Sequence, residues 1–204
     1  MSAHSSSDVP GHDRGPVPQV FVLSGIPGAG KSTVGGLLAQ RFERGVHVAG
    51  DGIRAMVVSG RVDMSPRPDA EAVDQLLLRY RVAVDVADRY RANGFCVVID
   101  DVIVGEMLER FLAMLPWHEV HLVVLDPELS AIRRREAERS KSAYDRTWTA
   151  GGLHRILHEQ TSRLGWWLDS TRLTPGTTVD AILARPELSV VHLPVPVLSK
   201  GASD

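Results

Sequence analysis

A glycine-rich segment that directly follows an apolar run constrains the fold of this chain more than any other feature. Residues 25–33 are Gly-Ile-Pro-Gly-Ala-Gly-Lys-Ser-Thr, which matches the pattern G-x-x-x-x-G-K-[ST]. The preceding run, Gln19–Ser24, has the composition of a buried strand, and apolar residues at helical spacing follow the glycines. This order predicts a phosphate cradle, because glycines let a loop turn its N–H groups inward. A glycine-rich turn that only caps a helix is the alternative.

The same segment predicts which groups meet a nucleotide and its magnesium ion. Lys31 can reach the β and γ phosphates, and the hydroxyl of Ser32 is a suitable Mg²⁺ ligand. The expected nucleotide contacts all lie in this loop and are Gly25, Gly28, Ala29, Gly30, Lys31, Ser32 and Thr33. Kinases, motor ATPases and switches share this cradle, so the loop alone does not identify what receives the phosphoryl group.

Short β-rich runs alternate with longer helix-periodic segments along the rest of the chain. After Gln19–Ser24, the expected strands are Val46–Gly50, Phe95–Asp100, Glu119–Leu125 and Trp166–Asp169. Such alternation predicts an α/β fold with a parallel sheet covered by helices. Residues 81–87 alternate like a strand, but the periodic stretch around them is too long for one, so we expect a helix there.

The length of the chain and the character of its ends predict one domain with two tails. At roughly 150 residues per domain, a chain of 204 residues has room for a single core. We expect a flexible tail at 1–18, the domain at 19–186 and an extended tail at 187–204. Residues 1–18 have almost nothing to bury, and the segment from 187 carries Pro194 and Pro196 before a polar end.

Charge and composition exclude several classes of protein. Lysine and arginine number 23 against 25 acidic residues, so no overall field favours nucleic acid or an anionic membrane as a partner. The longest apolar runs hold about five residues, far fewer than the roughly 20 that span a bilayer. Residues 1–18 lack the features of a secretory signal, so we expect a cytoplasmic protein. The single cysteine, Cys96, excludes an intramolecular disulfide.

Acidic residues follow two of the expected strands. Strand ends at the carboxyl edge of such a sheet face the ligand crevice, where Asp51 could accept the proton of an attacking hydroxyl. A helix N-cap is the alternative role for Asp51. Arg54, three residues later, would pair with a substrate or with a nearby acid. We expect Asp100 to hold Mg²⁺ and Asp101 to contact substrate, unless one of the two only caps the next helix.

A run of arginines follows the fourth expected strand at Arg133, Arg134, Arg135 and Arg139. Arginine side chains stabilise the charge of a phosphoryl group in transfer, and a mobile segment that carries them excludes water. Because Arg135 and Arg139 share a helix face, we expect this pair to be catalytic within an arginine-rich lid. A solvated helix face is the alternative for the other arginines.

Two histidines and one tryptophan give weaker signals. His154 and His158 are four residues apart on an expected helix, but the local sequence offers no third ligand. We therefore expect no metal there. Trp148, after the arginine run, is the tryptophan best placed to stack on a base or an aromatic substrate.

Taken together, these residues resemble the small P-loop kinases of the chloramphenicol phosphotransferase-like group, within the nucleoside-monophosphate-kinase-type fold. The segments that carry the resemblance are Gly25–Thr33, Ala49–Asp51, Arg133–Arg139, Trp167–Thr171, Leu173–Pro175 and Thr178–Ile182. The resemblance implies a five-stranded sheet in the order 2-3-1-4-5, dependence on ATP and Mg²⁺, and Asp51 as the base. It also implies that Thr174 and Pro175 lie near the adenine. Residues 57–69, which should line the acceptor pocket, match nothing in the group.

The function expected from the motifs and the resemblance is an ATP-dependent O-phosphotransferase that acts on a hydroxyl of a small molecule. The resemblance points to an antibiotic as the acceptor. The motifs alone do not separate an antibiotic from other acceptors, because acceptor choice depends on pocket shape. Two alternatives stay open at this point. One is a kinase of a metabolite or nucleotide-sugar, and the other is a nucleotide-binding regulatory ATPase.

Overall fold

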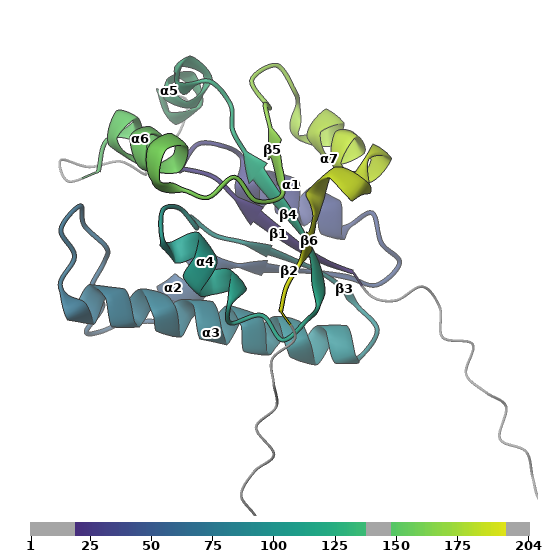
Figure 1. Ribbon diagram of the computed structural model, residues 1–204, viewed down its shortest axis with the longest axis horizontal. Helices are drawn as coiled ribbons and strands as arrows, with labels where there is room; N and C mark the ends of the chain where they lie inside the picture. Colours follow the sequence, from purple (N-terminus) through teal and green to yellow (C-terminus); the bar gives the residue numbers. More distant parts are fainter. Residues whose placement is uncertain (1–18, 138–147, 195–204) are drawn as a thin grey trace, which may run out of the picture.

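Five parallel strands form the centre of the molecule in the order β2-β3-β1-β4-β5 (Figure 1). The computed structural model describes residues 19–137 and 148–194, and the predicted tail at 1–18 lies outside them. The parallel strands are β1 (Val20–Ser24), β2 (Gly45–Ala49), β3 (Cys96–Asp100), β4 (Glu119–Leu125) and β5 (Trp166–Leu168). The five predicted strands and their order are thus confirmed, with ends that differ by one residue at most.

Helices cover both faces of this sheet (Figure 1). They are α1 (Lys31–Ala39), α2 (Gly50–Ala55), α3 (Ala70–Ala92), α4 (Met107–Leu112), α5 (Leu129–Ala137), α6 (Ala150–Gln160) and α7 (Pro175–Ala184). The alternating segment 81–87 lies within the 23-residue helix α3, as predicted. The N-cap of α3 is Asp69, whose carboxylate accepts a hydrogen bond from the Ala72 N–H. Among the helices described, none has the length and apolar character that would let it cross a membrane.

The central strand β1 shows why the sheet needs helices on both sides. Val20 and Val22 pack with residues of α3 and α4, whereas Phe21 and Leu23 pack with residues of α1 and α7. All four side chains are buried. Removing one such side chain from water stabilises the fold by about 1.5–3 kcal/mol. Apolar runs without polar alternation therefore fit the interior of a parallel sheet.

The end of the described chain differs from the expected tail. Pro186–Ser189 form a 3₁₀ helix and Val190–His192 form a short strand, β6, which pairs antiparallel with the first residues of β4. The Leu193 N–H donates to the His118 carbonyl at 2.7 Å and fixes the end of this strand. An extended tail from residue 187 was therefore the wrong prediction for 187–193, while residues 195–204 lie outside the described part of the chain.

The geometry of β4 explains this sixth strand. β5 pairs only with the last three residues of β4, Val123–Leu125, so the first residues of β4 have an open edge. Val190 and Val191 are β-branched and suit an edge position of this kind. Buried Ser189 adds a hydrogen bond to the His121 ring, 2.9 Å between Oγ and Nδ1.

Candidate functional site

The loop between β1 and α1 has the backbone that a phosphate cradle requires. Gly25 has a φ of +140°, and a Cβ there would lie 2.6 Å from the Leu125 carbonyl oxygen, so only glycine fits. Gly28 and Gly30 also have positive φ values, of 83° and 102°. α1 begins at Lys31, with no side-chain cap and no acidic residue in its first turn. Such a helix start attracts anions through its N–H groups and its dipole.

Behind the loop, the structure brings the two predicted magnesium ligands together. Ser32 Oγ donates a hydrogen bond of 3.3 Å to Asp100 Oδ1, although 68 residues separate them. The other carboxylate oxygen of Asp100, Oδ2, lies 2.6 Å from His47 Nε2. Asp100 is 2% exposed. A hydroxyl and a carboxylate side by side are oxygen donors that suit Mg²⁺.

The neighbouring glycines Gly35 and Gly36 in α1 provide a matched test of this arrangement. A Cβ on Gly35 would lie 2.7 Å from His47 Nε2, so we expect Gly35→Ala to push His47 from Asp100 and to lower the free energy of unfolding by about 1–3 kcal/mol. A Cβ on Gly36 meets its nearest atom at 3.8 Å, so Gly36→Ala should stabilise the helix by up to about 1 kcal/mol. Urea unfolding of both variants measures whether the free energy of unfolding falls in Gly35→Ala and rises in Gly36→Ala. A rise in both variants would contradict the close packing of Gly35 against His47.

Asp101 is enclosed and does not stand open toward a substrate. Its carboxylate is 5% exposed and accepts a hydrogen bond of 3.1 Å from Arg79 Nη2 and one of 2.7 Å from the Val102 N–H. Arg79 Nε makes an ion contact of 2.8 Å with the second oxygen, without the alignment of a hydrogen bond. Burial raises the pKa of Asp101, and the charge of Arg79 opposes that rise. The geometry thus shows a buried ion pair where we expected a substrate contact.

Asp51 and Arg54 lie on α2, directly after β2. The N-cap of α2 is Ala49, so the alternative role of Asp51 as an N-cap is wrong, and its carboxylate is exposed in the first turn. Its negative charge contributes to the raised pKa of Asp101, which places the two groups within electrostatic reach. Arg54 binds Asp63 through two hydrogen bonds of 2.7 and 2.6 Å, which raises the pKa of Arg54 and lowers that of Asp63. The sequence left a substrate or a nearby acid as the partner of Arg54, and the structure shows an acid, Asp63.

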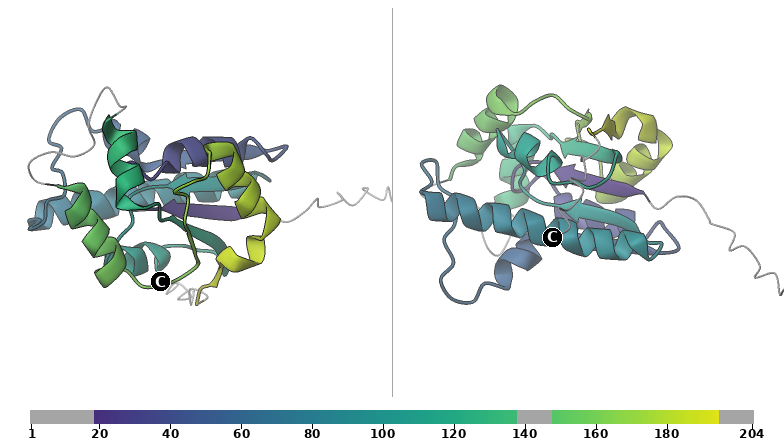
Figure 2. Two further views of the ribbon diagram at one scale, coloured as in Figure 1. Left: turned by 90° about the horizontal axis from the view of Figure 1, so that it is seen from above. Right: turned by 60° about the horizontal axis from the view of Figure 1, so that its bottom comes forward.

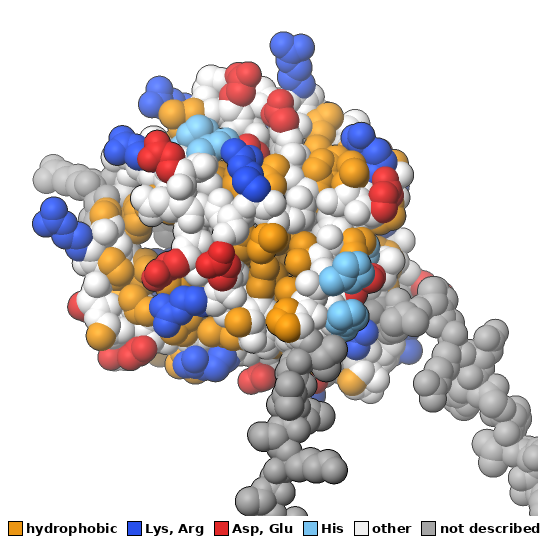
Figure 3. Space-filling model, viewed as in Figure 1, with side chains coloured by type: hydrophobic (Ala, Val, Ile, Leu, Met, Phe, Trp, Pro, Cys, Tyr) orange, Lys and Arg blue, Asp and Glu red, His pale blue; other side chains and the backbone are white. Residues whose placement is uncertain are grey.

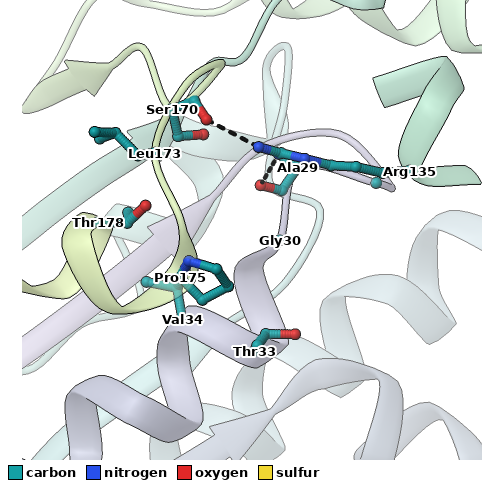
Figure 4. Close-up of a pocket in the computed structure, with 10 residues that line it drawn as sticks. Ala29, Gly30, Thr33, Val34, Arg135, Ser170, Leu173, Pro175 and Thr178 are labelled. Carbon is teal, nitrogen blue, oxygen red and sulfur yellow. Dashed lines mark hydrogen bonds between the residues drawn. The ribbon is translucent and has the colours of Figure 1, made fainter. Parts of the chain in front are cut away.

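A cavity of about 270 Å³ opens on the other side of the loop (Figure 4). Its lining residues are Gly28, Ala29, Gly30, Thr33, Val34, Arg135, Ser170, Leu173, Pro175 and Thr178. Five of these were predicted nucleotide contacts, namely Gly28, Ala29, Gly30, Thr33 and Pro175. Thr174 does not line the cavity; it caps α7 and accepts a hydrogen bond from the Thr177 N–H. Ser170 lines the cavity, and its hydroxyl is buried without a hydrogen-bond partner among the described atoms.

Arg135 connects the loop with the segment that follows β5. As Figure 4 shows, its side chain extends from α5 and donates to the Ala29 carbonyl at 3.1 Å and to the Ser170 carbonyl at 2.9 Å. Burial, with a smaller effect from neighbouring Arg134, lowers the pKa of Arg135. Arg139, the other half of the predicted pair, lies outside the described residues, as does the end of the arginine segment after Ala137.

Three residues of the site were not predicted from the sequence, namely His47, Arg79 and Ser170. His47 left a signal, because it is the one polar side chain in the strand Val46–Ala49. Arg79 gave none, since α3 carries many arginines and the partner is 22 residues away. Ser170 lay within the stretch 167–171 that carried the resemblance, but nothing indicated that its hydroxyl is buried.

Comparisons with known proteins identify the family and the fold of this chain. A family model described as an AAA domain matches residues 20–155. No curated protein matches the chain. The APS kinase of Mycobacterium tuberculosis, solved with AMPPNP and APS, is 18% identical with a TM-score of 0.59, and covers 84% of this chain and 99% of its own. A sugar kinase from Janibacter sp. HTCC2649 is 16% identical with a TM-score of 0.58. The match covers 84% of this chain and 96% of that kinase.

The tunicamycin resistance protein of Deinococcus radiodurans has the same fold. It is 14% identical with a TM-score of 0.58, and the match covers 87% of this chain and 99% of that protein. At such low identities these likenesses concern the fold, which is that of a P-loop kinase. The narrower resemblance to chloramphenicol phosphotransferases stays a prediction. Since the family model covers more than half of the sequence, the chain belongs to the AAA domain family that this model describes, with a P-loop kinase-like fold.

Proposed function

We propose that this chain is an ATP-dependent phosphotransferase that phosphorylates a hydroxyl group of a small molecule. One observation carries the proposal. The exposed carboxylate of Asp51 follows the carboxyl end of β2, at the same end of the sheet as the phosphate loop that follows β1. β2 and β1 both pair with β3, so their carboxyl ends flank the same strand. A phosphate cradle next to a carboxylate open to solvent is what hydroxyl phosphorylation requires.

Each residue of the site then has a chemical role. The loop amides and Lys31 bind the β and γ phosphates, and Ser32 and Asp100 would hold Mg²⁺. His47 fixes the rotamer of Asp100 through their 2.6 Å contact. When bound, the ion neutralises phosphate charge. Asp51 accepts the proton of the acceptor hydroxyl as that oxygen bonds to the γ-phosphorus and the bond to ADP breaks.

Arginine side chains supply the remaining positive charge in this proposal. Arg135 reaches the loop carbonyl of Ala29 and is already held beside the cavity. The charge that develops on the phosphoryl oxygens during transfer would be stabilised by Arg135 and by Arg139. For Arg139 this assignment rests on its sequence spacing alone.

The cavity of Figure 4 fits the adenine base. Its apolar wall is formed by Val34, Leu173 and Pro175. Ser170 also lines the cavity, and its carbonyl holds Arg135 beside it. The cavity adjoins the phosphate loop at Gly28–Gly30, as a nucleotide in this orientation would need.

The acceptor would bind on the Asp51 side of the loop, against an apolar surface. Met56, Val57 and Val58 follow the end of α2 and are 73%, 39% and 94% exposed. The segment 57–69 projects beside the first turns of α3 (Figures 1 and 2). Trp148, the tryptophan best placed in the sequence to stack on a ligand, donates from Nε1 to the Met64 carbonyl at 2.8 Å and holds this segment. We infer an acceptor with both a hydroxyl and an apolar part.

An antibiotic is our first choice of acceptor within this class. A structural neighbour is a tunicamycin resistance protein, and an apolar, hydroxylated antibiotic suits the exposed residues after α2. Neighbours also include a sugar kinase and a gluconokinase, so sugars and other metabolites form the second group to test. In both cases ATP is the expected phosphoryl donor and the reaction the same.

Incubation of the purified chain with ATP, Mg²⁺ and a panel of hydroxylated antibiotics, nucleosides and sugars tests the proposal. We expect one chemical class to gain the mass of a phosphoryl group. Lys31→Met should lower the rate of product formation on the order of 10²-fold or more, because the phosphates lose their main side-chain cation. Arg81→Met, on the exposed face of α3, is the control and should keep full activity.

A different result would point to another class of protein. Steady ATP hydrolysis that no acceptor stimulates, without a phosphorylated product, would contradict the transferase. It would favour the regulatory ATPase, the alternative that the sequence left open. Equal activity of Lys31→Met and the parent chain would instead show that the turnover does not come from this loop.

A further inference from the structure

A second cluster of chemically active side chains lies apart from the phosphate loop, between β4 and α6. It contains His154 and His158, one turn apart on α6, and Asp126, which follows the last residue of β4. One ligand atom from each of the three lies within 4.8 Å of the other two. The third ligand that the local sequence did not offer is therefore supplied by a residue 28 positions before His154.

The contacts in this cluster show that it is preassembled. His158 Nε2 lies 2.9 Å from Asp126 Oδ1, with side chains that are 30% and 17% exposed. The rings of His154 and His158 are 4.2 Å apart between centroids. Donor atoms around one tetrahedral zinc ion lie roughly 3–4 Å from one another, given bond lengths of about 2 Å. Only small movements would thus bring all three donors onto a single ion.

We propose that Asp126, His154 and His158 form a binding site for a divalent transition-metal ion, with zinc as its preferred occupant. Two imidazoles and one carboxylate are donors that zinc accepts, whereas Mg²⁺ prefers oxygen ligands and so would not compete well. Three protein donors leave a fourth position for water. The site is thus distinct from the magnesium site proposed at Ser32 and Asp100.

A neighbouring arginine determines which ring nitrogen of His158 carries the proton. The ring of His158 is constrained on its other side, where Arg163 Nη2 lies 3.2 Å from Nδ1. A guanidinium can only donate, so it holds Nδ1 as an acceptor and the proton on Nε2.

Arg163 therefore disfavours binding of a zinc ion at His158 Nε2, and its replacement should change the zinc affinity. Zinc binding at Nε2 would move the ring proton to Nδ1, facing the arginine. Arg163→Gln offers a carbonyl oxygen that can accept this proton, and it also removes a positive charge beside the ion. We expect the variant to bind zinc roughly tenfold more tightly.

An ion at this position would join α6 to the sheet next to the phosphate loop. Leu153 and Leu157 of α6 pack with Ile26 of the loop and with Ile132 of α5. α5 also carries Arg135, which lines the cavity. Occupancy would thus fix one wall of the nucleotide site, and we expect zinc to raise the Tm of the full chain.

Calorimetric titration of the chelator-treated, full-length chain with zinc chloride tests the site. We expect one saturable zinc ion per chain and a raised Tm, and no such effect from magnesium chloride. His154→Gln should lose both effects but keep the Tm of the metal-free chain, because the bond between His158 and Asp126 remains. His192→Gln is the control, since His192 is an exposed histidine on β6 and should leave zinc binding unchanged.

Two results would overturn the proposal. Equal zinc affinity in His154→Gln and the parent chain would place the ion elsewhere. An unchanged or weaker affinity in Arg163→Gln would show that the ion does not use His158 Nε2. Cobalt gives an independent reading, because Trp167 lies 6.0 Å from the His158 ring and its fluorescence should be quenched by bound cobalt in the parent chain but not in His154→Gln.

Discussion

Asp51→Asn is expected to lower kcat by about 10²- to 10⁴-fold, because an amide cannot accept the proton of the acceptor hydroxyl. ATP affinity should stay nearly constant, since Asp51 belongs neither to the phosphate loop nor to the lining of the cavity. The change is almost isosteric and its site is exposed, so the fold should be unaffected. Rates of product formation and the Kd of a non-hydrolysable ATP analogue measure the two effects separately.

Asp85→Asn is the matched control for this experiment. Asp85 is exposed on α3, and its replacement changes the net charge by the same amount. We expect full activity from it. If Asp51→Asn also kept its activity, the base assignment would be wrong, whereas a loss of ATP binding in Asp51→Asn would show that the carboxylate has a role in the nucleotide site.

Arg79→Met should destabilise the protein by roughly 3–5 kcal/mol, which is the usual effect of leaving one member of a buried ion pair without its partner. Arg79 and Asp101 have side chains only 17% and 6% exposed, so water cannot replace the lost contact. The pKa of Asp101 is already raised by burial and would rise further without the guanidinium. Urea unfolding at neutral pH measures the loss.

A second substitution separates the charge from the packing. In Arg79→Met/Asp101→Asn no buried charge remains, so part of the lost stability should return. Arg81→Met, which is exposed on the same helix, should change the free energy of unfolding by less than about 0.5 kcal/mol. Equal losses in the Arg79 single variant and in the double variant would mean that packing, and not the buried charge, causes the effect.

Local patterns predicted much of this fold. The glycine pattern at 25–33 identified the loop, because each of its positions is constrained by backbone geometry that only certain residues allow. Apolar runs identified the five parallel strands, and the length of the periodic stretch identified α3 as a helix. β6 was missed because three residues in a polar and proline-containing segment give too short a pattern.

Contacts between distant residues could not be predicted in the same way. The bond between His47 and Asp100 joins residues 53 positions apart and depends on the register of β2 against β3, which the predicted strand order leaves open. The approach of Asp126 to the α6 histidines depends in the same way on how α6 packs beside the end of β4. The predicted strand order placed several of these groups at one end of the sheet, but only register and side-chain packing determine which of them meet.

The antiparallel pairing of β6 with β4 has a consequence for how this chain behaves at high concentration. An unpaired strand edge is a template for the strand of another molecule, and β6 covers such an edge at Glu119–His121. A shortened expression product that ends at Arg185 would expose this edge and, with it, the apolar surface beneath Leu193. Self-association and low solubility would then reflect the missing residues 186–193 and not any fault in the nucleotide site.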